Sequence, residues 1–221
     1  QVSTQVFTVT DYTESSLVDT CPPHIKVPLK LHQRATIHRC ISREKNNPPI
    51  VHNNHTFRCN IGVIGDKVGA GKSLMVLGLI GYRIPVQANR FTDTYTDTDD
   101  SHMFQYTYQW TLQEYGYGNK CNLIVIPHSV LNQWKSFIDT QTTGLEVFYY
   151  NKKTKTQLSY KTLNDYDIIV VTSTHIRDFY THIHKGIHKN CDIEFNRIFV
   201  DEADSIKNTY HLPDGRFYWL I

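Results

Sequence analysis

Short, continuous apolar runs recur along the second half of the chain, and segments of helical character separate them. The runs are rich in Ile, Val, Leu and Phe and show no polar alternation, so each is predicted to be a buried strand. Strands of this kind that alternate with helices are typical of a parallel sheet covered on both faces. The predicted strands are 123–126, 146–150, 168–171, 197–200 and 217–221, and the predicted helices are 130–138 and 174–182.

The first half of the chain is less regular. Residues 1–27 are polar and interrupted by two prolines, and we interpret them as a peripheral N-terminal segment. A helix that a proline can open is predicted over about 28–41. A short strand at 61–64 ends in a glycine-rich turn, and a helix follows over 74–82. Residues 85–119 are rich in Asp, Thr and Tyr with weak periodicity, which indicates a polar surface insertion.

The glycine-rich turn has the composition of a phosphate-binding loop. Residues 69–73 read Gly-Ala-Gly-Lys-Ser and open a predicted helix, where backbone amides and the helix dipole favour a phosphate group. Lys72 would reach the β and γ phosphates, and the Ser73 hydroxyl would bind Mg²⁺. The first glycine of the strict motif is missing, because Asp66 stands at that position. A glycine-rich turn with a solvated lysine is the alternative.

Two carboxylates directly follow the predicted strand at 197–200. Asp201 can hold Mg²⁺, which prefers few carboxylates together with phosphate oxygens. Glu202 can orient and deprotonate an attacking water, which is much of what phosphoryl transfer requires. An acidic turn at a strand end is the alternative for these residues. Because ligands of such sheets bind beyond the carboxyl ends of the strands, we expect Lys72, Asp201 and Glu202 to converge on one magnesium–triphosphate pocket.

These segments together resemble the first motor domain of superfamily 2 helicases and translocases, and most closely the Swi/Snf-like branch. The loop of that branch reads Asp-Glu-hydrophobic-Gly-x-Gly-Lys-Thr, to which residues 66–73 are similar, with Lys67 in place of Glu and Ser73 in place of Thr. The resemblance implies that the whole loop contacts the nucleotide. Its residues are Asp66, Lys67, Val68, Gly69, Ala70, Gly71, Lys72 and Ser73.

Further segments carry the resemblance in the order that the family shows. Gln33 follows a histidine in a segment similar to the family's upstream helix, which implies that Gln33 reads the adenine edge. Residues 123–134 and 167–173 are similar to two segments on the nucleic-acid side. Residues 201–208 resemble Asp-Glu-Ala-His-x-hydrophobic-Lys-Asn, with Asp204 in place of His. The nucleic-acid residues implied by the resemblance are Pro127, His128, Ser129, Thr172 and Ser173.

The resemblance covers about residues 28–221 outside the insertion and implies a three-layer α/β fold, a RecA-like P-loop NTPase domain with a mainly parallel sheet. It implies the ATP-binding half of a nucleic-acid-dependent ATPase, a helicase or double-stranded DNA translocase that moves on or remodels DNA or RNA. ATP and Mg²⁺ would be its cofactors, double-stranded DNA its favoured partner, and a second RecA-like domain the other half of the motor. We expect this chain to be an excerpt that hydrolyses ATP poorly on its own. In its richness in Asn, Tyr and Ile and in its Gly-Ala-Gly-Lys-Ser loop, the sequence also resembles helicase-like ATPases of large DNA viruses.

Composition narrows the setting in which such a domain would work. The net charge is only +2, with 23 Lys and Arg against 21 Asp and Glu, so any nucleic-acid contact must come from a local patch. Five scattered cysteines form no disulfide framework and indicate a reducing compartment. We therefore expect an intracellular protein, in the nucleus, a cytoplasmic viral factory or the virion. No apolar run reaches the length of about 18 residues that a membrane span needs.

Two other functions fit parts of the sequence. The domain could be a non-translocating ATP-binding subunit or an interaction module of a viral transcription complex, although the retained phosphate loop and acidic pair argue against the loss of activity. A simple P-loop kinase would need an acceptor site and a lid, for which the sequence offers no candidate. The oligomeric state stays open.

Several other features have simpler interpretations. Trp134 is interpreted as a helix anchor packed on the core and not as a base-stacking residue. The lysines within 152–161 form a small basic cluster, by default a solvated face and otherwise a contact for nucleic-acid phosphates. A histidine-rich stretch is interpreted as a solvated loop, because structural zinc sites usually show paired, cysteine-rich spacing. Its candidate ligands are His182, His184, His188 and Cys191.

Overall fold

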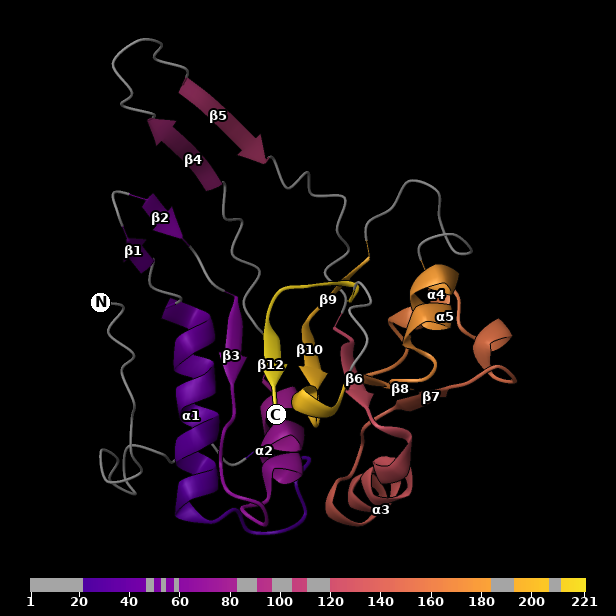
Figure 1. Cartoon of the computed structure of the whole chain (residues 1–221). Helices are drawn as coiled ribbons and strands as arrows, with labels where there is room; N and C mark the ends of the chain where they lie inside the picture. Colours follow the sequence, from indigo (N-terminus) through magenta and orange to yellow (C-terminus); the bar gives the residue numbers. More distant parts are fainter. Residues whose placement is uncertain are drawn as a thin grey trace.

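A six-stranded, wholly parallel sheet forms the centre of the molecule, in the strand order β3–β12–β10–β6–β8–β7 (Figure 1). The computed structural model describes residues 22–46, 50–52, 55–57, 60–82, 91–96, 105–110, 120–183, 193–206 and 212–221. Each predicted strand is found within this sheet. The strands are β3 (Ile61–Val63), β6 (Asn122–Ile126), β7 (Val147–Tyr150), β8 (Ile168–Thr172), β10 (Arg197–Val200) and β12 (Tyr218–Leu220).

Helices cover both faces of the sheet. They are α1 (Leu31–Asn46), α2 (Lys72–Ile80), α3 (Leu131–Gln141), α4 (Tyr160–Leu163) and α5 (Ile176–Thr181). Short 3₁₀ helices are η3 (His128–Val130), η4 (Lys155–Gln157) and η6 (Ala203–Ser205). Within the described ranges, three further pairs of strands lie outside the main sheet, formed by β1 (Ile50–His52), β2 (His55–Phe57), β4 (Phe91–Thr96), β5 (Gln105–Trp110), β9 (Glu194–Phe195) and β11 (Asp214–Gly215).

The alternation of side chains along the buried strands creates two cores. On one face, Ile124, Val170 and Phe199 pack with residues of α1, α2 and α3. On the other face, Val125 and Ile169 pack with residues of α4 and α5. The central strands β6, β8 and β10 are apolar at most positions because both of their faces are buried. The molecule is therefore a three-layer α/β domain, which confirms the predicted fold class.

A buried ion pair joins the first helix to the sheet. Arg197 opens β10 and donates two hydrogen bonds to the Glu44 carboxylate at the end of α1, both of 2.7 Å. The Trp219 indole of β12 donates to the same carboxylate at 2.8 Å, and Arg197 also donates to the Tyr82 carbonyl just after α2. Both charged side chains are almost fully buried. This cluster fixes α1 and the end of α2 against two central strands.

Two segments of the first half are more ordered than their composition indicates. Residues 22–27, which we placed in the N-terminal segment, lie against the helical layer. The His24 ring donates from Nε2 to the Leu77 carbonyl of α2 at 2.6 Å, and Ile25 forms a bridge with Thr142 after α3. Within the predicted insertion at 85–119, β4 and β5 pair in antiparallel fashion. Periodicity did not predict this pair, nor the hairpin of β1 and β2.

Candidate nucleotide-binding site

The phosphate loop and the acidic pair leave the sheet at the same edge. β3 leads into the loop and β10 into Asp201, with β12 between them. Val63 pairs with Leu220, which pairs with Val200, so the three strands end level with one another. Adjacent strands are about 4.8 Å apart, so the ends of β3 and β10 are about 10 Å apart. The predicted convergence of Lys72 with Asp201 and Glu202 is compatible with this edge, at the lower end of the strands in Figure 1.

Two glycines give the loop its shape. Gly69 and Gly71 both have φ of 83°, a left-handed conformation that favours glycine, and Gly71 is the N-cap of α2. A Cβ added at Gly71 would lie 2.4 Å from Nε2 of Gln33, so a side chain at that position would require the Gln33 amide to move. The tip of the loop is open to solvent, since Val68 is 99% exposed and Gly69 has no neighbour around its Cβ position. The backbone is thus arranged for close approach of a phosphate.

The Lys72 ammonium lies across the loop. Its Nζ donates to the Asp66 carbonyl at 2.9 Å, which joins the two ends of the turn. Lys72 and Ser73 occupy the first turn of α2, where backbone amides have no intrahelical acceptor. The ammonium and the helix-terminal amides can bind phosphate oxygens, and the hydroxyl oxygen can bind Mg²⁺. These are the groups that a magnesium-bound phosphate chain requires. The described residues therefore fit the predicted ligand.

The helix upstream of the sheet supports the loop from behind. Gln33 is only 5% exposed, and its Nε2 donates to the Ala70 carbonyl at 3.2 Å while its Oε1 accepts from the Lys30 amide at 2.9 Å. His32 donates from Nε2 to the same Ala70 carbonyl at 3.0 Å. Both ends of the Gln33 amide are engaged inside the domain, which makes Gln33 a support of the loop. The adenine contact implied by the resemblance stays a prediction.

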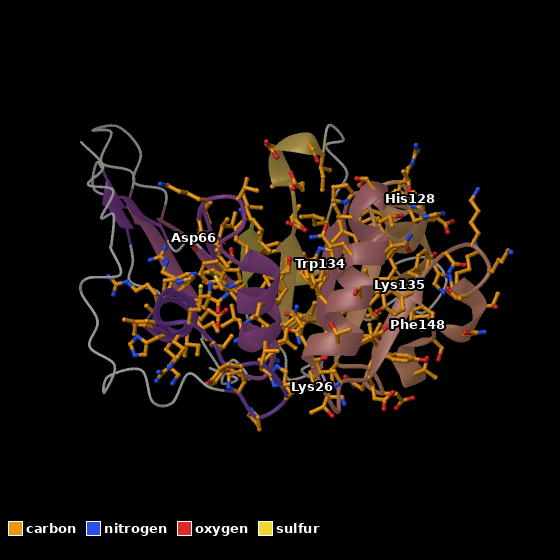
Figure 2. The ribbon with its side chains drawn as sticks, turned by 90° about the horizontal axis from the view of Figure 1, so that it is seen from below. Lys26, Asp66, His128, Trp134, Lys135 and Phe148 are labelled. Atoms are coloured by element: carbon orange, nitrogen blue, oxygen red, sulfur yellow. The ribbon has the colours of Figure 1, made fainter. Side chains whose placement is uncertain are left out.

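The Asp201 carboxylate is held on both oxygens. The Trp134 indole of α3 donates to Oδ2 at 2.7 Å, and the Glu202 backbone amide donates to Oδ1 at 3.1 Å. The Asp201 amide donates to the Val125 carbonyl of β6, which anchors the residue at the end of the sheet. Figure 2, which looks onto the carboxyl ends of the strands, shows Asp66 by the loop and Trp134 where α3 adjoins α2. As predicted, Trp134 is buried on the core.

Glu202 has an unusual backbone. Its φ of 52° and ψ of 47° are left-handed, and it is the one non-glycine residue with positive φ in the part of the chain that the structure describes. Its side chain is exposed, and its carbonyl accepts from the amide and the hydroxyl of Ser205 in η6. A strained residue of this kind is retained where the surrounding structure over-determines it, and such residues cluster at functional sites.

The residues predicted to contact nucleic acid divide into two groups. His128 and Ser129 are exposed in η3, directly before α3. Thr172, by contrast, is only 4% exposed, and its hydroxyl forms hydrogen bonds with the Thr174 hydroxyl and with Nδ1 of His175. Thr172 therefore supports its turn from inside and does not present its side chain at the surface. The nucleic-acid contact that the resemblance implies for Thr172 stays a prediction.

The remaining two predicted residues border these turns. Pro127 is the partly exposed N-cap of η3, and the Ser173 amide donates to the Ile126 carbonyl of β6 at 2.7 Å. The ends of β6 and β8 are thereby tied together, so the two predicted nucleic-acid segments lie next to each other. Their neighbouring position is what a shared path for one strand would require.

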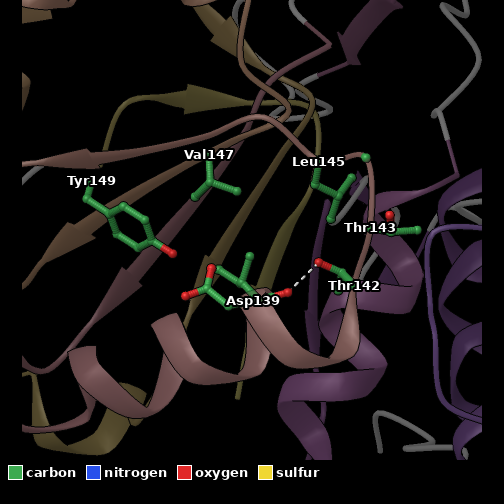
Figure 3. A pocket seen from close by; sticks show the side chains of 8 residues that line it. Asp139, Thr142, Thr143, Leu145, Val147 and Tyr149 are labelled. Atoms are coloured by element: carbon green, nitrogen blue, oxygen red, sulfur yellow. Dashed lines mark hydrogen bonds between the residues drawn. The ribbon is translucent and has the colours of Figure 1, made fainter.

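A pocket of about 290 Å³ lies elsewhere, between the end of α3 and β7 (Figure 3). Burial and the nearby Asp139 carboxylate raise the pKa of Tyr149, on its wall, to about 12. The pocket shares no lining residue with the phosphate loop or the acidic pair, so it does not bear on nucleotide binding. Its lining residues are Ile138, Asp139, Thr142, Thr143, Gly144, Leu145, Val147 and Tyr149.

The described members of the histidine-rich stretch and of the basic cluster have partners or positions away from the phosphate loop. His182 donates from Nε2 to the Leu158 carbonyl at 3.0 Å, and the other three candidate zinc ligands lie outside the described residues. No group of three metal-binding side chains occurs in the described ranges. Lys155 pairs with Asp178 at 3.3 Å, while Lys152 and Lys153 are exposed. None of the described helices is long and apolar enough to cross a bilayer.

Comparison with known families decides the relationship. The family described as "SNF2-related domain" matches residues 32–212, which is most of the chain. The chain belongs to this family. It is a domain of the helicase-like SNF2 ATPases, and the predicted resemblance to the Swi/Snf-like branch is confirmed.

Two solved structures share the fold. The Sulfolobus solfataricus SWI2/SNF2 ATPase core in complex with dsDNA has a TM-score of 0.54 and 18% identity, and the match covers 90% of this chain and 32% of that one. The ATPase core domain of the same organism has a TM-score of 0.52 and 17% identity over the same shares. These likenesses support the RecA-like fold.

Two curated relatives are similar in sequence. A protein of Acanthamoeba polyphaga mimivirus that is named as a helicase is 34% identical over 83 residues, which are 36% of this chain and 8% of that protein. Transcription termination factor 2 of Drosophila melanogaster is 23% identical over 200 residues, 85% of this chain and 17% of that protein. The chain thus spans less than a fifth of the length of either relative.

Proposed function

We propose that this domain binds magnesium–ATP and is the ATP-binding half of a nucleic-acid-dependent ATPase, with double-stranded DNA as the favoured track. The observation that carries the proposal is the common edge of the sheet, where the loop after β3 and the acidic pair after β10 leave strands of matched register. Membership of the SNF2-related family supports ATP as the nucleotide.

Each residue of the site has a task that its position permits. Lys72 would exchange the Asp66 carbonyl for oxygens of the β and γ phosphates, and the amides that open α2 would bind the same groups. Ser73 and Asp201 would hold Mg²⁺, which neutralises charge on the phosphates when bound. Glu202 would accept a proton from a water aligned with the γ phosphate. The oxygen of this water would bond to the γ phosphorus while the bond between the γ phosphorus and the β-phosphate oxygen breaks.

The nucleic-acid side of the proposal rests on the ends of β6 and β8. His128 and Ser129 are exposed there, and Ser173 is tied to Ile126 beside them. Polar side chains and backbone amides of this kind bind phosphates without reading bases, which suits a motor that moves over many sequences. One solved relative in fold is an ATPase core in complex with dsDNA, which favours duplex DNA over RNA.

Nucleotide binding tests the proposal directly. Titration with a fluorescent ATP analogue should show magnesium-dependent binding by the wild-type chain, and Lys72→Ala should lose it while its circular dichroism and thermal unfolding stay close to wild type. Because Lys72 also bonds to Asp66, Lys72→Met provides a second variant that keeps an aliphatic stem. Unchanged affinity in both variants would refute the phosphate-loop assignment.

A non-translocating role in a transcription complex is the second candidate, favoured by the similarity to transcription termination factor 2 over 85% of the chain. The two candidates differ in stimulation by a track. ATP turnover by the full-length protein that carries this domain should rise with double-stranded DNA if the domain belongs to a translocase. Turnover that no DNA or RNA changes would favour the transcription module.

A further inference from the structure

The hydrogen bond between the Trp134 indole and Asp201 has no role in the function described so far. The donor and acceptor lie 67 positions apart in the sequence and 2.7 Å apart in space. Trp134 is 1% exposed and lies in α3, at the centre of the view in Figure 2. Core packing alone does not require this pair, since any large apolar residue would fill the volume without aiming a donor at a carboxylate.

The bond is of the strong kind. A neutral N–H that donates to an ionised carboxylate forms a shorter and stronger bond than one between neutral partners, and 2.7 Å lies at the short end of the range for such bonds. Because the indole is buried, water does not compete for the donor. The indole is also locked by the apolar side chains of α2 and the sheet around it. It is therefore a rigid donor.

The second oxygen of Asp201 is fixed from the other side. The Glu202 amide donates to Oδ1 at 3.1 Å, so the two bonds together fix the rotation of the carboxylate. Each carboxylate oxygen has two lone pairs, so both bonds can persist while Oδ1 or Oδ2 also accepts from a water or faces a cation. The carboxylate is thus oriented before any ligand arrives.

We infer that Trp134 is a positioning residue for magnesium: its indole N–H orients the Asp201 carboxylate toward the phosphate loop. This inference rests on the proposed function, since it takes Asp201 as the magnesium-binding carboxylate. Side chains that orient a ligating carboxylate without touching the metal typically contribute a factor of about 10 to 100 in metal affinity. The same scale is expected here.

The structure provides a matched control. Trp219 is also buried, at 4% exposure, and its indole also donates to a carboxylate, that of Glu44 at 2.8 Å. That carboxylate is paired with Arg197 away from the phosphate loop. Trp134→Phe and Trp219→Phe therefore remove the same chemical group and a similar volume, one next to Asp201 and one remote from it.

The experiment measures magnesium dependence and not turnover. Binding of a fluorescent ADP analogue is titrated with Mg²⁺, and repeated in EDTA, for wild type, the two Trp variants and Asp201→Asn. We expect Trp134→Phe to raise the half-saturating Mg²⁺ concentration about tenfold, with affinity in EDTA unchanged. Trp219→Phe should leave both values as in wild type, and Asp201→Asn should give the largest shift. Benzothienylalanine at position 134, which keeps the indole shape without the N–H, should reproduce the shift if the Phe variant does not fold.

The outcomes separate the inference from the function beneath it. A wild-type chain without magnesium-dependent binding contradicts the proposed function. A normal wild type, a shifted Asp201→Asn and an unshifted Trp134→Phe leave the function standing and overturn the positioning role. Equal shifts in both Trp variants, or an equal loss of affinity with and without Mg²⁺, would show that position 134 contributes packing alone.

Discussion

The side-chain amide of Gln33 holds the carbonyl of Ala70, so the start of α1 supports the turn that is proposed to bind phosphate. The Gln33 oxygen is occupied as well, by the Lys30 amide. The resemblance to the Swi/Snf-like branch implies that this glutamine reads adenine. The geometry adds a second role, because a residue that holds the loop would influence every nucleotide equally.

Substitution of Gln33 separates these two roles. Gln33→Leu keeps the volume and removes the bond to Ala70, worth about 1 kcal/mol or a factor of about 5 in affinity. We expect fluorescent ATP and GTP analogues to lose affinity to the same extent. His32→Ala, which removes the neighbouring donor to the same carbonyl, should act similarly and less than additively. Loss of ATP affinity alone would instead assign Gln33 to the adenine.

The left-handed backbone of Glu202 predicts an unusual effect of glycine. An L-residue in this conformation is destabilised by about 1–2 kcal/mol, which glycine avoids, although glycine loses about 0.5–1 kcal/mol through its freer unfolded chain. Glu202→Gly should therefore unfold at a temperature equal to or above that of wild type. Asp204→Gly, two residues away in η6, is the control and should lower the unfolding temperature. A marked loss of stability in Glu202→Gly would show that its carboxylate makes an essential contact.

The buried pair of Glu44 and Arg197 predicts a large, asymmetric loss of stability. Glu44→Ala leaves the guanidinium buried without its partner, which typically costs about 3–5 kcal/mol. The double variant Glu44→Leu with Arg197→Met removes both charges and should recover most of that loss. Urea unfolding followed by circular dichroism measures both. A double variant no more stable than Glu44→Ala would mean that the bonds to Trp219 and Tyr82 dominate the cluster.

Two thiols are predicted to be unreactive in the folded protein. Burial, the first cause, raises the pKa of both Cys40 and Cys121, and the nearby carboxylates of Glu44 and Asp167 raise it further. The thiolate is the reactive form, so alkylation by iodoacetamide at mildly basic pH should be slow at both sites. Peptide mass mapping should show labelling only after addition of denaturant. Rapid labelling of Cys121 would indicate that the end of the sheet opens locally.

The sequence predicted the elements of the central sheet well, because its strands are mostly continuous apolar runs that differ sharply from their surroundings. The places of the glycine-rich turn before α2 and of the acidic pair after β10 were also predictable, since each depends on adjacent residues, while their ligands stay a prediction. The pairs β1–β2 and β4–β5 were not predictable, because their strands are short and mix polar and apolar residues.

Contacts between segments that are distant in the chain could not be predicted from the sequence. Trp134 was predicted as a core residue on its helical position, but nothing in its spacing shows that its N–H reaches Asp201. The burial of Thr172 was equally hidden, since a threonine at the end of a strand can face either side. The ion pair of Glu44 and Arg197 spans 153 positions and depends on how α1 crosses the sheet.

Trp134 lies in α3, close in sequence to the exposed residues of η3. The helix follows directly on η3, so Ser129 at the surface and the buried indole are separated by about 10 Å of stiff backbone. Hydrogen bonds weaken steeply once their geometry is disturbed. If η3 contacts DNA as proposed, a small displacement of η3 would change the geometry of the hydrogen bond between Trp134 and Asp201, and it would thereby couple the proposed nucleic-acid contact to the proposed magnesium site.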